Sequence, residues 1–227
     1  KRKDLCRRPV LTERRFGMIE RNIVVTCLRH AIAELVNGQV ADKDRLLSEQ
    51  GIRQARERRL KLGNPQFALV LHSPVRRAKQ TALIIADMTD SDQRLVAIPQ
   101  ICLPPKPENQ QQAQEKAAID ESFQALGNCA LRNYLGPTQS ANSLRGFVRR
   151  SIFYLEERMG AAELADSDRM LIIGHAVLLP ALGHEWLMIH SHPTLALRML
   201  DVVLNETQGF EIEFCCRQAV SLELIAD

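Results

Sequence analysis

The residues with the clearest chemical potential are two histidines and two arginines that follow three short apolar runs. Arg29 and His30 come directly after the run at residues 22–28, Arg77 lies shortly after a second run, and His175 follows a third. A neutral imidazole is a nucleophile when one ring nitrogen keeps its lone pair and the other donates to a fixed acceptor. A guanidinium is planar, always charged and suited to bidentate contact with phosphate oxygens. Together these residues predict phosphoryl transfer, with an attacking histidine among cations that neutralise the oxygens.

The elements that must position these residues alternate along the chain. Apolar runs predict buried strands at residues 22–28, 67–71, 95–98 and 170–173. Helical spacing predicts helices over 47–62, from 73 to about 88, and over 108–126, 143–159 and 177–186. Ser48 and Ser73 are predicted N-caps, with Pro74 at the first helical position of the second helix. This alternation predicts an α/β fold of three layers, a mostly parallel sheet with helices on both faces. Sites in such folds lie beyond the carboxyl ends of the strands.

The domain organisation predicted from the sequence is one catalytic domain, residues 22–227, preceded by a basic arm of residues 1–21. A chain of 227 residues suits one sizeable domain. Residues 1–22 carry eight Lys or Arg against three acidic residues, although the whole chain has a net charge of only +3. The arm is either a contact for an acidic partner or a solvated terminus, and we expect a poorly ordered terminus because chain ends fray. Residues 99–143, rich in Pro, Gln and Asn, are predicted to be an insertion over the active-site end.

The composition excludes several classes of protein. Apolar residues make up 45% and charged residues 25%, as in an ordinary globular protein. The apolar stretches are too short to cross a bilayer, and an aromatic content of 4% is too low for a base-stacking platform. The six cysteines form no CxxC pair and no regular framework, which favours a reducing, cytoplasmic setting. We therefore expect neither a membrane nor a nucleic acid as a partner, and the oligomeric state is not predicted.

The common nucleotide-binding and hydrolase motifs are also absent from the sequence. It contains no GxxxxGK[ST], no GxGxxG and no GxSxG. The stretch from Asp42 to Leu46 partly matches the DxDx[TV] loop of another phosphatase class, but Leu46 breaks the pattern and no buried strand precedes it. We expect no metal and no cofactor.

Four motifs, taken in order, resemble the histidine phosphatase superfamily, also called phosphoglycerate mutase-like. They are Leu28-Arg29-His30, the LSEQGIRQA stretch at 47–55, the SPVRRAKQTA stretch at 73–82, and Gly174-His175. The resemblance covers about residues 22–187, and the first three motifs together are quite specific. It implies that His30 is the nucleophile that forms a phosphohistidine. Arg29 and Arg77 would bind the phosphoryl group, and His175 would complete the pocket.

Several positions near these motifs refine the resemblance. Arg77, and not Arg76, directly precedes Ala-x-Gln-Thr and takes the role of the pocket arginine. Ala31 stands where the superfamily usually has Gly, as in the small bacterial phosphohistidine phosphatases, which the chain resembles in that detail. The backbone amides at Ala176 and at the start of the following helix would add anion stabilisation.

The proton donor is the part of the resemblance without a clean match. Many members carry an acidic donor after the third strand, in a Leu-x-Glu context. In this chain Glu108 is the best candidate for the donor, and Glu121 is the next. Because the small phosphohistidine phosphatases lack an obvious glutamate there, the mismatch points away from alkyl phosphates and mutase chemistry.

The resulting prediction is a metal-independent phosphatase that hydrolyses a phosphomonoester or phosphohistidine through a phosphohistidine on His30. Its substrate would be a phosphorylated small molecule or a phosphoprotein. Three alternatives stay open at this point: a phosphoglycerate-mutase-type phosphotransferase on the same fold, a catalytically silent module that binds phosphorylated ligands, and a scaffold whose functional part is the basic arm.

Overall fold

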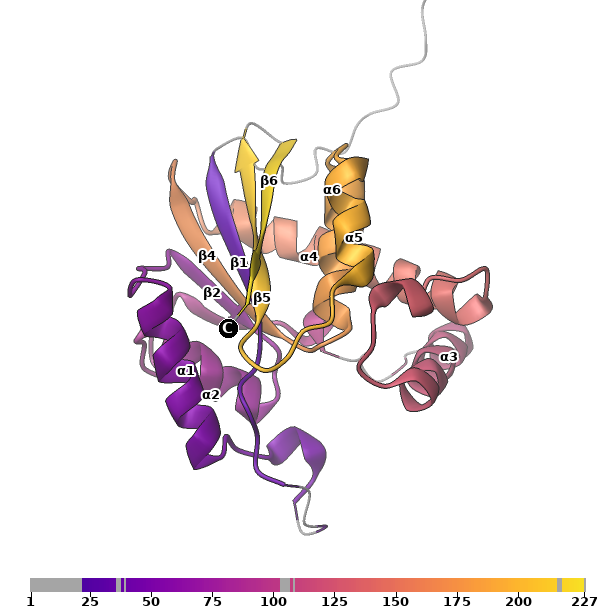
Figure 1. The fold of residues 1–227 in the computed structure, drawn as a ribbon, viewed down its shortest axis with the longest axis horizontal. Coiled ribbons are helices and arrows are strands. Elements are labelled where there is room, and N and C mark those ends of the chain that lie inside the picture. Colours follow the sequence, from indigo (N-terminus) through magenta and orange to yellow (C-terminus); the bar gives the residue numbers. More distant parts are fainter. Residues whose placement is uncertain are drawn as a thin grey trace, which may run out of the picture.

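A mostly parallel sheet forms the centre of the computed structural model, which describes residues 22–35, 38, 40–102, 107, 109–215 and 218–226. The basic arm predicted for residues 1–21 lies outside the described residues. The strands are β1 (Ile23–Arg29), β2 (Leu69–His72), β3 (Leu95–Ala97), β4 (Asp168–Gly174), β5 (Gly209–Cys215) and β6 (Gln218–Ile225). Their order in the sheet is β3-β2-β4-β1-β5-β6 (Figure 1). The first four in that order run parallel, whereas β5 is antiparallel to both β1 and β6.

Helices cover both faces of the sheet (Figure 1). The helices are α1 (Glu49–Lys61), α2 (Arg76–Ala86), α3 (Gln110–Leu126), α4 (Gln139–Ala161), α5 (Leu178–Ile189) and α6 (Pro193–Arg198). On one face, α1 and α2 form an apolar cluster with the sheet, and on the other face α4, α5 and α6 form a second cluster. The three-layer α/β fold predicted from the sequence is thereby confirmed. No helix in the described part of the chain is long and apolar enough to span a membrane.

The apolar runs form strands because successive side chains belong alternately to the two apolar clusters. Along β4, Met170 and Ile172 belong to the cluster with α4 and α5, whereas Leu171 and Ile173 belong to the cluster with α1 and α2. Successive side chains of a strand point to opposite faces, so a central strand with both faces covered must be apolar at every position. All four of these side chains are fully buried.

The two predicted helix caps had different outcomes. The Ser48 hydroxyl accepts from the Gly51 amide, which makes it the expected N-cap of α1. The prediction for Ser73 was wrong, because α2 begins only at Arg76 and its N-cap, Val75, makes no side-chain capping bond. The Ser73 hydroxyl is instead hydrogen-bonded to a histidine at the sheet edge, so a tertiary contact replaces the local one.

Residues 99–143 include α3 and the first turns of α4, which starts four residues before its predicted beginning at 143. The buried side chains of Ile119, in α3, and Leu131 join the cluster formed with α4 and α5. This segment therefore brings α3 to the side of the molecule remote from α1 and α2, as Figure 1 shows.

Candidate active site

The parallel pairing of β1 with β4 brings the first and last sequence motifs together. Arg29 lies opposite Gly174 in the sheet register, and the His30 amide donates to the Gly174 carbonyl over 3.1 Å. His30 and His175, each the next residue after its strand, therefore lie beside each other, with ring centroids 5.3 Å apart. The prediction that these two motifs meet at the carboxyl edge of the sheet agrees with this geometry.

His30 is held as a neutral imidazole with a defined tautomer. Its Nδ1 lies 2.8 Å from the carbonyl oxygen of Ala31 and must donate to it, because a carbonyl can only accept. The lone pair is then on Nε2, which accepts from Arg77 Nε over 3.1 Å. Burial, above all, lowers the pKa of His30 to about 4; the charges of Arg77 and Arg29 add to this, and the Ala31 hydrogen bond opposes it. At neutral pH, Nε2 is therefore an unprotonated nitrogen beside a guanidinium.

The backbone after His30 is fixed by residues of the second and third motifs. The Thr81 hydroxyl accepts from the Ala31 amide over 3.0 Å and donates to the Arg77 carbonyl over 2.7 Å. A Cβ on Gly51 would lie 2.0 Å from the Ile32 carbonyl oxygen, so only glycine lets α1 approach this loop so closely. The LSEQGIRQA and SPVRRAKQTA motifs thus have a physical role, which is to position the loop that carries the histidine.

Arg77 is buried at the start of α2 and is paired with Asp42. Its Nη1 donates to the Asp42 carbonyl over 2.6 Å, and its Nη2 donates to Asp42 Oδ2 over 3.0 Å. The Arg77 side chain is 8% exposed, whereas the Asp42 side chain is 63% exposed. Partial burial tends to raise the pKa of Asp42, but hydrogen bonds from Arg45 and Arg77 outweigh it and lower the pKa, so the carboxylate is ionised.

Asp42 is a site residue that the sequence reasoning missed. Asp42 is the first residue of the imperfect DxDx[TV] match, which predicts no site here, and nothing in the local pattern marks Asp42 as a partner of Arg77. The contact depends on the path of the connection between β1 and α1, in which Asp42 begins the 3-10 turn Asp42–Asp44 (η1). That path becomes visible only in three dimensions.

Arg29 is the last residue of β1, and both of its Nη atoms contact the segment that follows α6. Its Nη1 donates to the Leu204 carbonyl over 2.8 Å, and its Nη2 forms an ion pair with Glu206 over 2.7 Å. Its Nε is buried and has no hydrogen-bond partner within the described residues. The Nε–H of the arginine is therefore a donor that is open to a further acceptor.

Arg29, His30, Arg77 and His175 form the polar cluster of the site. His175 is held there by Ser73, the residue after β2. Its Nε2 is hydrogen-bonded to the Ser73 hydroxyl over 2.8 Å. Burial is the main reason that its pKa is lowered to about 3, and the neighbouring His30 and Arg77 lower it further. His175 is thus neutral at physiological pH, and the cationic charge of the cluster comes from the two arginines.

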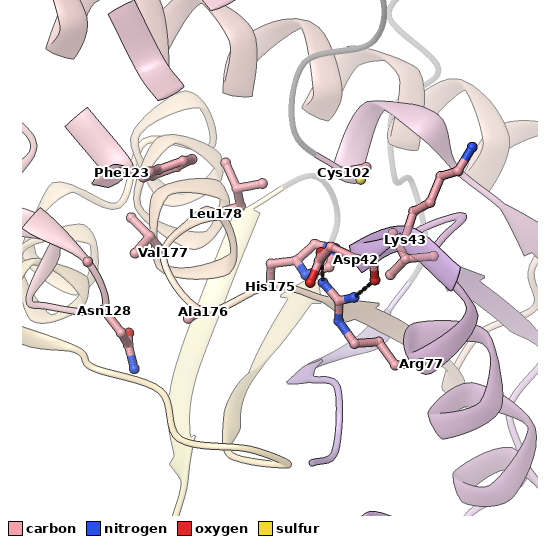
Figure 2. A pocket seen from close by; sticks show the side chains of 12 residues that line it. Asp42, Lys43, Arg77, Cys102, Phe123, Asn128, His175, Ala176, Val177 and Leu178 are labelled. Carbon is pink, nitrogen blue, oxygen red and sulfur yellow. Dashed lines mark hydrogen bonds and ion pairs between the residues drawn. The ribbon is translucent and has the colours of Figure 1, made fainter. Parts of the chain in front are cut away.

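A cavity of about 460 Å³ opens beside this cluster (Figure 2). Asp42, Lys43, Arg77 and His175 line one side of it, and Ala176, one of the predicted phosphate-binding positions, lies at the adjoining entrance to α5. His30 is not among its described lining residues, but it contacts Arg77, which is one of them. The cavity is therefore next to the candidate nucleophile, because the Arg77 guanidinium both lines the cavity and contacts His30.

Of the two proton-donor candidates, the structure describes one. Glu108, the first choice, lies outside the described residues. Glu121 is described, is exposed on α3, and is not among the described residues that line the cavity. Within the part of the chain that the structure describes, no group of three or more His, Cys, Asp or Glu side chains could hold a metal ion.

Solved structures of other proteins define the class to which this fold belongs. The alpha-ribazole phosphatase of Shigella flexneri shares 18% identity and a TM-score of 0.56, over 89% of this chain and 96% of that one. Mycobacterial glucosyl-3-phosphoglycerate phosphatase has 19% identity and a TM-score of 0.56, over 90% of this chain and 97% of that one. Phosphoglycerate mutase of Bacillus anthracis has 14% identity and a TM-score of 0.58, over 92% of this chain and 94% of that one. At these identities the likeness shows the fold, which is of the phosphoglycerate mutase-like α/β class.

The family is shown by the sequence itself. The model of the histidine phosphatase superfamily (branch 1) matches residues 25–208, and the chain belongs to this superfamily. The resemblance that the ordered motifs suggested is confirmed, and with it the expected class of enzyme, a phosphatase. No curated protein matches the chain in sequence.

Proposed function

We propose that this protein is a metal-independent phosphatase in which His30 takes up the phosphoryl group of a phosphomonoester or phosphohistidine substrate. The observation that carries the proposal is the state of His30: Nδ1 is fixed to the Ala31 carbonyl, and Nε2 keeps its lone pair beside Arg77. Covalent catalysis by histidine requires one unprotonated nitrogen and a fixed second nitrogen, and Nε2 gives up the hydrogen bond from Arg77 Nε when it attacks.

The first chemical step joins Nε2 to phosphorus while the bond from phosphorus to the leaving group breaks. Nδ1 keeps its proton, and the Ala31 carbonyl stabilises the positive charge that develops on the ring. Arg77 offers Nη1 and Nη2 to the phosphoryl oxygens in place of Asp42, and Arg29 offers its unpartnered Nε. These guanidinium groups supply the positive charge for the transition state, so the step needs no metal ion. The departing oxygen or nitrogen takes a proton, and Glu108 remains the proposed donor.

The second step returns the enzyme to its starting state. Water attacks phosphorus and gives a proton to the carboxylate of the proposed donor, Glu108, which lost its own in the first step. The bond between phosphorus and Nε2 breaks, and orthophosphate leaves with the oxygen from water. Backbone amides from Ala176 onward, before α5 at Leu178, are available to the anion. The proposal also covers the setting and the substrate. Cys27, Cys102 and Cys129 are free thiols, which supports a cytoplasmic setting, and the substrate is a phosphorylated small molecule or phosphoprotein.

Steady-state hydrolysis of p-nitrophenyl phosphate by the purified protein tests the proposal. His30→Ala should lower kcat by at least about a thousandfold, because the covalent route is lost. His192→Ala, at the N-cap of α6 and not among the described residues that line the cavity, is the matched control and should stay close to wild type. If His30→Ala retains full activity, the proposal is wrong. Incubation with a phosphoglycerate decides between the two enzyme types, since a phosphatase releases orthophosphate and a mutase yields the isomer.

A further inference from the structure

The cavity beside the cluster has two chemically different ends, which Figure 2 shows on opposite sides. The charged residues among its described lining are Asp42, Lys43 and Arg77, and all three come from η1 and the start of α2. This end adjoins His30 and would receive the phosphoryl group. Whatever is attached to that group must then extend toward the other end.

The other end is built largely from apolar side chains. Phe123 comes from α3, and Val177 and Leu178 come from the start of α5. Val177 and Leu178 are nearly buried, at 8% and 6% exposed, so this wall is backed by the core and keeps its shape. An aromatic ring facing branched aliphatic side chains favours a flat, apolar group between them.

The apolar end offers few hydrogen bonds. Asn128 is the polar side chain there, and its Nδ2 already donates to the Leu204 carbonyl over 3.2 Å. Its oxygen and its second N–H are what is left to meet a ligand. A leaving group with several hydroxyls would lose hydrogen bonds to water and regain few of them, which costs binding free energy for each unsatisfied group.

The size of the cavity fits a phosphoryl group with one ring attached. A volume of about 460 Å³ lies in the lower half of the range for small-molecule sites, roughly 300–1,000 Å³. Its mixture of a small charged end and a larger apolar wall matches a ligand with one anionic head and an apolar body.

From this arrangement, and resting on the proposed function, we infer that the substrate is a small-molecule phosphomonoester whose leaving group is an apolar alcohol with an aromatic ring. This departs from the expectation that the proton-donor mismatch raised against alkyl phosphates. The ring lies against Phe123, Val177 and Leu178, and the phosphoryl group lies against Arg77. Phosphates of sugars, glycerol or glyceric acid are disfavoured, because Asn128 is the one polar side chain that the described residues offer to their hydroxyls at the apolar end.

The test compares benzyl phosphate with glycerol 1-phosphate, whose leaving alcohols have similar acidity, so that a difference in kcat/KM reports binding and not leaving-group reactivity. Wild-type protein should hydrolyse benzyl phosphate with a kcat/KM on the order of tenfold or more above that for glycerol 1-phosphate. Phe123→Ala should remove most of this preference, because it should lower kcat/KM for benzyl phosphate much more than kcat/KM for glycerol 1-phosphate. Phe153→Ala removes a phenyl ring that is 53% exposed on α4, outside the cavity, and should leave both values unchanged.

A second variant guards against a folding defect in Phe123→Ala. Val177→Thr keeps the size of the side chain but replaces a methyl group of the wall with a hydroxyl, and it should lower the benzyl preference several-fold. Equal hydrolysis of both substrates, or a preference that survives in both variants, would overturn the inference while the phosphatase proposal stands. If neither these esters nor p-nitrophenyl phosphate is hydrolysed, the proposed function itself fails and the inference falls with it.

Discussion

The ion pair between Asp42 and Arg77 leads to a counterintuitive prediction: removing a negative charge from the site should tighten the binding of inorganic phosphate. In the free protein the Asp42 carboxylate and carbonyl occupy both Nη atoms of Arg77. A phosphate that takes the Nη2 donor displaces the carboxylate, so the free energy of that internal contact is subtracted from the free energy of binding. Asp42→Asn keeps the shape of the side chain and removes its charge.

The expected magnitude follows from the exposure of the pair. Because the Asp42 side chain is 63% exposed, solvent screens the interaction and its net contribution is about 0.5–1 kcal/mol. Without the Asp42 carboxylate as a competitor, the dissociation constant for orthophosphate or vanadate should be roughly two- to fivefold lower. Isothermal titration calorimetry at low ionic strength measures it, and the gain should shrink as salt is added.

Asp44→Asn is the matched control for the change in net charge. Asp44 belongs to the same 3-10 turn, but its carboxylate lies 3.9 Å from Arg76 and not against Arg77. It should change the affinity for phosphate much less than Asp42→Asn does. An unchanged or weaker affinity in Asp42→Asn would refute the reasoning, since Asp42 would then support the anion site and not compete for it.

Four further predictions concern the histidines and the loop that carries the nucleophile. Because the pKa values of His30 and His175 are lowered to about 4 and 3, kcat/KM, corrected for substrate ionisation, should stay flat down to about pH 5; an acid limb near 6.5 would contradict their burial. Both histidines take up protons more readily when unfolded, so the free energy of unfolding should fall as the pH drops below about 6.5, which urea titrations measure. Gly51→Ala places a Cβ against the Ile32 carbonyl and should cost about 1–3 kcal/mol in stability and lower kcat/KM, and a wild-type Tm would count against this close approach. Thr81→Val keeps the shape but leaves a buried amide unsatisfied, so urea unfolding should show a loss of about 1–3 kcal/mol, and no loss would mean that the loop is held by other contacts.

The strands and the meeting of the motifs could be predicted because both follow from order along the chain. A run such as the one ending at Ile173 is apolar at every position, which only a strand covered on both faces requires. Once the strands are parallel, the residues after them share an edge, so His30 and His175 had to be neighbours. The position of Arg77 at the start of a helix after β2 follows in the same way.

Features that depend on contacts between remote segments could not be predicted. Ser73 has the residue type and spacing of an N-cap, yet its hydroxyl bonds to His175, which is 102 residues away. Asp42 meets Arg77 because a turn folds back over the sheet edge, and no periodicity encodes that path. The apolar end of the cavity combines α3 with α5, and its composition emerges only when both are placed.

The most direct test of the central claim is to identify the atom that carries phosphate during turnover. Protein quenched in alkali during steady-state hydrolysis, then digested, should yield a phosphorylated peptide that contains His30, with the phosphorus on Nε2 by ³¹P nuclear magnetic resonance. The structure predicts this isomer because Nδ1 is committed to the Ala31 carbonyl. Phosphate on Nδ1, on another residue, or on no residue at all during active turnover would contradict the account.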